Sequence, residues 1–135
     1  MLNFLEFLKE DKTIFDYLLF PPEGEELKLA TMISKMKNSS RYVYRGMSFK
    51  EWTVLQKNGR VVSKGAGNTR DIQGSYVGSD VQLAGRFALR AWKDKLGGVI
   101  VTLDKSRLPD LNKADPGNYW TSYIPKEAVV SKVIL

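Results

Sequence analysis

The hydrophobic pattern changes from helical to strand-like about one third of the way along the chain. From Leu2 to Lys37, apolar residues recur at three- and four-residue steps, with a break at Pro21-Pro22 and a further helix expected from about Glu25 to Lys37. Short apolar runs with strand character follow, with two helical patterns among them. This order predicts one α+β domain over residues 1–135, a helical part at 1–40 and a β-rich core at 41–135, rather than a doubly wound parallel sheet.

Caps, glycines and prolines divide the core into elements. Ser48-x-x-Glu51 has the spacing of a capping box and predicts a helix that ends at Asn58-Gly59. A Ser79-Asp80 cap predicts a second helix, which turns Val81, Ala84, Phe87, Ala88 and Ala91 inward. Strands are expected at Arg41–Arg45, Arg60–Ser63, Ser75–Gly78, Gly98–Asp104, Thr121–Pro125 and Val129–Leu135, with a glycine-rich loop at Lys64–Gly74 and a polar loop at Ser106–Asn118.

Composition restricts the chemistry that the protein can perform. The 135 residues include no cysteine and no histidine, which excludes disulfides, thiolate nucleophiles, thiolate or imidazole metal ligands and imidazole bases. Charged residues interrupt the apolar start of the chain too early for a signal sequence or a membrane span, so a cytoplasmic protein is expected. The net charge of +6 suits a nucleic acid, a phosphate-bearing ligand or an acidic protein surface, or serves only solubility.

Arg45 is the first candidate for a binding residue. It stands at the expected end of a strand and is followed at once by Gly46 and the Ser48 cap, which favours a bound anion near its guanidinium. The alternative is a solvated strand-end arginine, with Gly46 serving only the turn. The glycine-rich loop at 64–74 carries two cations but lacks the spacing of a Walker A loop.

The order of motifs from Tyr42 to Leu135 resembles the arginine-serine-glutamate class of mono-ADP-ribosyltransferases, especially the small forms in phages and bacterial toxins. That family opens its core with an aromatic-Arg-Gly strand, which Tyr44-Arg45-Gly46 matches. Its serine-bearing strand and a helix of the form Asp-x-x-x-Ala-x-x-Phe-Ala follow, and Asp80 to Ala88 fits that helix. The family's last motif carries a glutamate, a few apolar residues and a proline, and here the proline is in Ile124-Pro125.

The resemblance implies N-terminal helices followed by a split antiparallel-type β core, with a site that uses NAD as substrate and needs no metal. Arg45 would pair with the NAD diphosphate, and Ser75 would hold the nicotinamide pocket and orient the acid that stabilises an oxocarbenium-like transition state. The NAD-binding residues implied in this way are Tyr44, Arg45, Gly46, Ser75, Tyr76 and Phe87. The expected target is a host protein, with nucleic acid as an alternative.

The chain departs from the family at the catalytic acid. Aligning Ile124-Pro125 with the family's apolar-Pro pair places Thr121 where the glutamate should stand. A hydroxyl cannot supply that negative charge, and Asp110, Asp115 and Glu127 are substitutes that also fit solvated loop carboxylates. Three hypotheses remain open: an ADP-ribosyltransferase with an unconventional acid, an inactive transferase fold that binds and inhibits a partner protein, and a basic nucleic-acid-binding domain.

Overall fold

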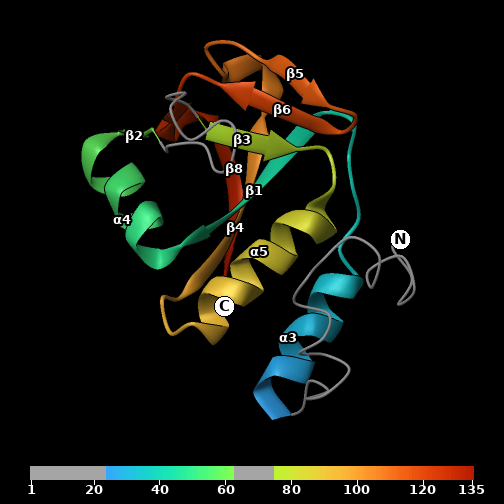
Figure 1. Cartoon of the computed structure of the whole chain (residues 1–135). Helices are drawn as coiled ribbons and strands as arrows, with labels where there is room; N and C mark the ends of the chain where they lie inside the picture. The colour runs from blue at the N-terminus through green and yellow to red at the C-terminus, as the bar shows by residue number, and fades with distance from the viewer. Residues whose placement is uncertain (1–23, 63–74) are drawn as a thin grey trace.

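The computed structural model describes residues 24–62 and 75–135, which form an α+β fold (Figure 1). Its helices are α3 (Gly24–Ser34), α4 (Phe49–Asn58) and α5 (Val81–Lys93), with short 3₁₀ turns η2 (Lys105–Arg107) and η3 (Lys126–Ala128). Its strands are β1 (Tyr42–Ser48), β2 (Arg60–Val61), β3 (Ser75–Gly78), β4 (Gly98–Asp104), β5 (Asn112–Asp115), β6 (Asn118–Thr121), β7 (Ile124–Pro125) and β8 (Val129–Ile134). The predicted fold class is therefore confirmed; the helix expected before Pro21-Pro22 and the loop at 64–74 lie outside the described residues.

The main sheet is antiparallel and opens between two of its strands. Its six strands follow the order β5-β6-β3-β1-β4-β8, and β2 and β7 form a separate pair. Strand β1 pairs with β4 along its whole length, but its described ladder with β3 is the single pair Tyr44 and Gly78. The sheet thus consists of a β5-β6-β3 half and a β1-β4-β8 half that diverge beyond this pair, which agrees with the predicted split core.

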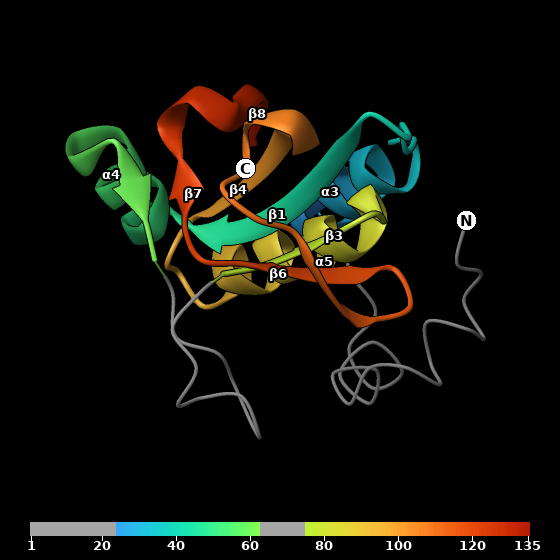
Figure 2. The same cartoon turned by 90° about the horizontal axis from the view of Figure 1, so that it is seen from above.

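Helix α5 lies directly on β1 and β4, because glycines remove side chains at the contact. A Cβ built on Gly46 would overlap the Ala84 carbonyl oxygen, and one built on Gly98 would overlap the Ala88 carbonyl oxygen. Small residues on both sides therefore let the helix backbone approach the strands closely. Helix α3 packs against the other side of α5 through the buried Ile33, and Figure 2 shows both helices on one side of β1.

The opposite face of the sheet carries the larger apolar core. Successive strand residues point to opposite faces, so Val43 and Met47 of β1 face away from α5 while Tyr44 faces toward it. Trp52 and Leu55 of α4 bury themselves against this second face. Helix α4 begins at the predicted Ser48 cap, whose Oγ accepts from Glu51 N at 3.2 Å, and ends at Gly59 with φ of 77°.

Several expected boundaries were wrong. Strand β1 continues to Ser48 instead of ending at Arg45, so Gly46 is a strand residue and not a turn residue. The expected polar loop from 106 to 118 contains β5, which pairs with β6 in a hairpin. The strand expected over 121–125 is two elements, since β6 ends at Thr121 and β7 begins at Ile124.

Candidate functional site

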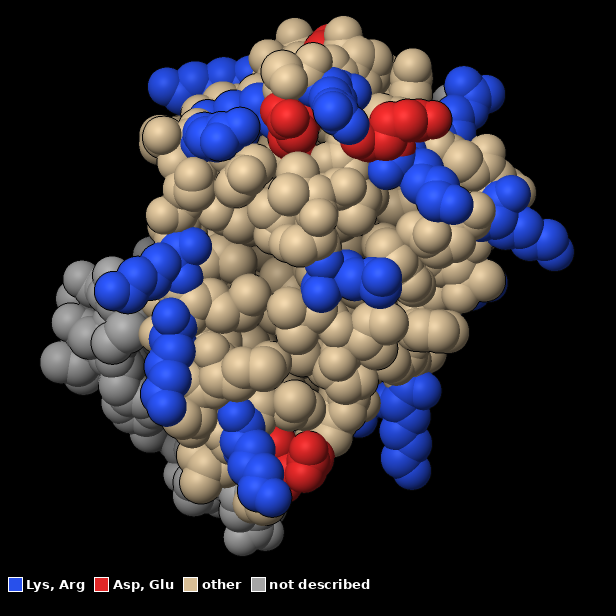
Figure 3. Space-filling view, turned by 180° about the vertical axis from the view of Figure 1, so that it is seen from behind, with Lys and Arg blue, Asp and Glu red and all other residues tan. Residues whose placement is uncertain are grey.

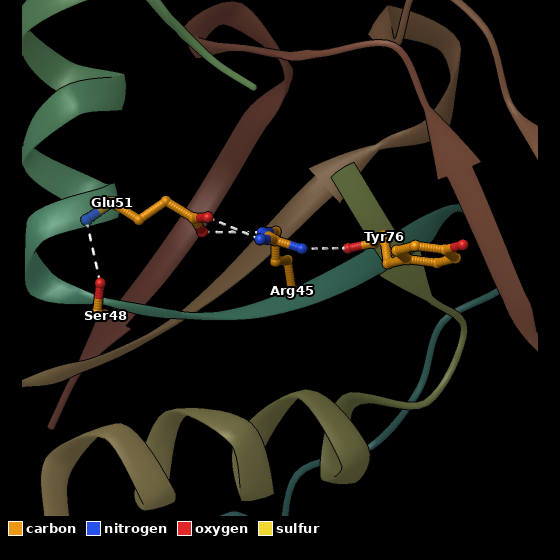
Figure 4. Close-up of polar contacts among 4 residues, drawn as sticks. All are labelled: Arg45, Ser48, Glu51 and Tyr76. Atoms are coloured by element: carbon orange, nitrogen blue, oxygen red, sulfur yellow. Dashed lines mark hydrogen bonds and ion pairs between the residues drawn. The ribbon is translucent and has the colours of Figure 1, made fainter. Parts of the chain in front are cut away.

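Arg45 lies in the interior of β1 and spans the opening between the two halves of the sheet. Its Nε donates to Glu51 Oε2 at 2.9 Å and its Nη2 donates to Glu51 Oε1 at 2.7 Å. Its Nη1 donates to the Tyr76 carbonyl oxygen on β3 at 2.7 Å (Figure 4). One guanidinium therefore links β1, β3 and α4 where the backbone ladder between β1 and β3 stops.

Glu51 reaches Arg45 because the chain turns sharply from strand into helix. Ser48 caps α4 and places Glu51 in the first helical turn, where a carboxylate is favoured by the helix dipole. The pair is partly shielded, with side-chain exposures of 16% for Arg45 and 17% for Glu51. The sequence identified Glu51 only as a capping residue. The available signal that it could face Arg45 was their separation of six residues across the predicted junction of strand and helix.

Ser75 and Thr121 face each other across β3 and β6. They are direct cross-strand partners and both are fully buried. Ser75 shares its strand face with Val77, which belongs to the same core as Val43 and Met47 on either side of Arg45. The structure therefore brings Arg45, Ser75 and Thr121 onto one face of three neighbouring strands.

Asp110 occupies the region beside Thr121. Its carboxylate accepts from Thr121 Oγ1 at 3.1 Å, from Ser122 N at 2.7 Å, from Ser122 Oγ at 2.8 Å and from Asn112 Nδ2 at 3.1 Å. These donors, with the Ser122 backbone N–H first, hold the pKa of Asp110 below its ordinary value of 3.8. Asp110 is therefore a partly exposed loop carboxylate whose oxygens are held by hydrogen bonds from the Thr121–Ser122 segment and from Asn112.

The structure describes the side chain of one of the other two substitutes for the missing acid. Glu127 is exposed on η3, and its backbone carbonyl accepts from Arg107 Nη1 at 3.1 Å. The side chain of Asp115 lies outside what the structure describes. Thr121 itself donates to Asp110 or to the Tyr123 carbonyl oxygen, at 3.1 and 3.2 Å.

The remaining residues expected to bind NAD lie on the α5 side of the sheet. Tyr44 is buried there, and its hydroxyl accepts from Ser39 N at 2.8 Å. Gly46 faces the backbone of α5, and strand alternation directs the Tyr76 side chain to the same side. Phe87 was expected to face inward, but it is 60% exposed because it lies at the margin of the α5 contact. Tyr44, Gly46, Tyr76 and Phe87 are thus separated by the sheet from the Arg45 side chain.

The start of α5 is already capped by two side chains. Asp80 Oδ1 accepts from Gln82 N at 2.9 Å, as the sequence predicted, and Asn38 Oδ1 accepts from Val81 N at 2.7 Å. Ser79 is turned away and its hydroxyl donates to the Gly117 carbonyl oxygen at 3.2 Å. The first backbone donors of α5 are therefore taken up within the protein rather than directed at a ligand.

On the face seen in Figure 3, basic side chains are scattered rather than gathered in one stripe. Figure 3 shows lysine and arginine side chains scattered over one broad face, with a few acidic side chains among them. Within the described ranges, no helix is long and apolar enough to cross a membrane. The same residues contain no group of three or more acidic side chains placed to hold a metal ion.

The geometry therefore gathers the three residues that the resemblance singled out as catalytic, and leaves most of the expected NAD-binding residues on the other face. Comparison with known proteins adds no family assignment to this geometry. The chain matches no protein-family model, and no curated protein matches its sequence.

Proposed function

We propose that this protein is an ADP-ribosyltransferase-like protein that uses NAD and acts on a host protein. The observation that supports the proposal is the gathering of Arg45, Ser75 and Thr121 on one face of β1, β3 and β6. These residues are 30 or more positions apart in the sequence, and the motif order alone singled them out. Their convergence is what a shared site requires.

Arg45 is the residue that would recognise the substrate. Its planar guanidinium already holds a bidentate carboxylate, the geometry that also suits two oxygens of a diphosphate. Ser75, in the buried pair with Thr121, would shape the floor beside it. The dinucleotide would thus lie across the opening between β1 and β3, where Arg45 bridges the two half-sheets.

The expected activity is slow, because the site lacks a carboxylate at position 121. Removing one preorganised electrostatic group typically lowers a rate on the order of 10²- to 10³-fold. Asp110 cannot replace it in its observed arrangement, since four donors already occupy its two oxygens. Glu51 is the other described carboxylate beside these residues, and it is paired with Arg45.

Calorimetric titration with NAD tests the proposal. Wild-type protein should bind NAD, and Arg45→Lys, which keeps the charge but loses the bidentate fork, should bind it at least about tenfold more weakly. Arg41→Lys is the matched control, because Arg41 is exposed and its guanidinium lies over the Tyr42 ring, 5.7 Å from the ring centroid. Equal NAD binding by wild type and Arg45→Lys, or no binding by wild type, would refute the proposed site.

The second candidate function is an inactive transferase fold that inhibits a partner protein. The observation in its favour is the hydrogen-bond network that joins Asp110 to Thr121 and Ser122. In this network Thr121, at the position of the family's glutamate, makes a structural contact. It predicts no transfer of label from NAD to any protein in a host lysate, together with stable capture of one partner.

The third hypothesis, a nucleic-acid-binding domain, predicts binding that weakens steeply with salt, as counterion release requires.

A further inference from the structure

The bidentate site on Arg45 is already filled by an anion that belongs to the chain. We propose that Glu51 competes with a diphosphate-bearing ligand for Arg45, so that Glu51 sets the affinity of the site and must be displaced when the ligand binds. The inference rests on the proposed function, since it concerns the same arginine. It assigns Glu51 a role beyond the helix cap that its spacing predicted.

The shape of the pair supports competition. Glu51 presents two oxygens to Nε and Nη2 of Arg45, at 2.9 and 2.7 Å, which is the edge that a phosphate also uses. Both side chains retain some exposure, 16% and 17%, so a ligand can reach the pair without unfolding the domain. A carboxylate in this position lowers the positive potential that a free arginine would offer to an incoming anion.

The third nitrogen makes the exchange feasible. Nη1 of Arg45 donates to the Tyr76 carbonyl oxygen at 2.7 Å, a neutral acceptor on a different strand (Figure 4). This bond holds the guanidinium in place while the edge formed by Nε and Nη2 changes partner. The arginine is therefore presented in one orientation to either anion.

Glu51 can leave without melting α4. The helix start is secured by Ser48, whose Oγ accepts from the backbone N–H of Glu51, a bond that does not involve the Glu51 side chain. Arg45 is then released by rotation about the side-chain bonds of Glu51 rather than by a change in the helix backbone. A purely structural ion pair is the competing explanation, in which Glu51 holds Arg45 ready and helps rather than hinders the ligand.

Titration of three ligands into four proteins separates these explanations. The ligands are NAD, ADP and inorganic pyrophosphate, and the proteins are wild type, Glu51→Gln, Arg45→Lys and Glu127→Gln. Glutamine keeps the size of Glu51 and one acceptor but removes its charge. Glu127→Gln changes the net charge equally at an exposed residue on η3, and so measures the nonspecific gain in anion affinity.

Competition predicts that Glu51→Gln binds ADP and pyrophosphate at least about tenfold more tightly than wild type. The gain is expected because the variant loses the carboxylate that competes for Arg45 through charge-assisted hydrogen bonds. Glu127→Gln should match wild type within about twofold, because exposed charges interact weakly. Tighter binding of pyrophosphate and ADP without NAD binding would support the inference and refute the NAD proposal. Binding of NAD by wild type that is equal or weaker in Glu51→Gln would overturn the inference and leave the NAD proposal standing.

A second measurement covers the case in which Glu51→Gln folds poorly. In wild-type protein labelled with ¹⁵N-arginine, the Arg45 Nε–H resonance can be assigned by its loss in Arg45→Lys. Saturation with pyrophosphate should shift this resonance as its partner changes from carboxylate to phosphate. Pyrophosphate binding with an unshifted resonance, or no binding of any of the three ligands to wild type and Glu51→Gln, would overturn the inference.

Discussion

Gly46 offers the sharpest test of how the motif Tyr44-Arg45-Gly46 is used. The sequence suggested a turn residue or a close approach to NAD, but the glycine lies within β1, opposite Ile100 of β4, and faces α5. In Gly46→Ala the new methyl would overlap the Ala84 carbonyl oxygen and stand 2.8 Å from Ala88 N. It would also lie 2.9 Å from Phe87 Cβ. Two of these three atoms belong to helix backbone and cannot rotate away.

The expected loss of stability follows from this geometry. Overpacking a core by one methyl group typically costs about 1–3 kcal/mol, and rigid backbone neighbours place Gly46→Ala at or above the upper end. A decrease of about 3 kcal/mol in the free energy of unfolding corresponds to a urea midpoint lower by about 1.5 M, at a slope near 2 kcal/mol/M. Fluorescence of the buried Trp52 is a suitable probe of the transition.

Gly78→Ala is the matched control. Gly78 is also a strand glycine, but the atom nearest to its added Cβ is a side-chain oxygen of Asn118 at 3.3 Å, which can move. We expect this variant to stay within about 1 kcal/mol of wild type. If Gly46→Ala is no less stable than Gly78→Ala, the close contact between β1 and α5 does not require the glycine. Weaker NAD binding at unchanged stability would assign Gly46 to the ligand instead.

Three further variants test contacts that the sequence alone did not establish, each by urea unfolding. Asn38→Ala should lower the free energy of unfolding by about 1 kcal/mol, because Val81 N loses its capping partner; no change would show that Asp80 caps α5 alone. Ser48→Ala should cost a similar amount, about 1 kcal/mol, at the start of α4, and an unchanged midpoint would contradict the cap. Asp110→Asn should cost about 1–3 kcal/mol at pH 7. Because the folded-state pKa of Asp110 lies below 3.8, its contribution is present above about pH 4 and is lost as the pH falls through that folded value, so a difference from wild type that grows as the pH is lowered from 4 would contradict the assignment.

Local signals predicted the helix caps and strand β4 well. The Ser48 and Asp80 caps stand where the sequence placed them, and β4 spans Gly98 to Asp104 as expected. These features depend on neighbouring residues, through the hydrogen-bonding capacity of short polar side chains and the alternation of apolar ones. Helix caps and strand alternation can therefore be predicted without knowledge of the tertiary structure.

The misjudged residues depend on distant contacts. The end of β1 was placed too early because a glycine in a strand pattern resembles a turn, and only the approach of α5 explains it. Asp110 lies next to a proline in a polar segment, and its donors Thr121, at the end of β6, and Ser122, just after it, are eleven and twelve residues away. Phe87 matched a helical apolar face, but α5 rests on the sheet through smaller residues, including Ala84 and Ala88.

Arg45 combines a structural and a candidate binding role, and this affects how its variants are interpreted. In Arg45→Ala, the Tyr76 carbonyl oxygen and the Glu51 carboxylate would both lose a donor at a partly buried position. Leaving such a group unpaired typically costs about 1–3 kcal/mol, which could by itself reduce the amount of folded protein and with it the apparent ligand binding. Lysine keeps a positive charge at position 45, and glutamine keeps one oxygen acceptor at position 51. Arg45→Lys and Glu51→Gln therefore test the site with less damage to the fold than Arg45→Ala. Loss of binding in a variant whose unfolding midpoint equals that of wild type is therefore the result that identifies Arg45 as a ligand-binding residue.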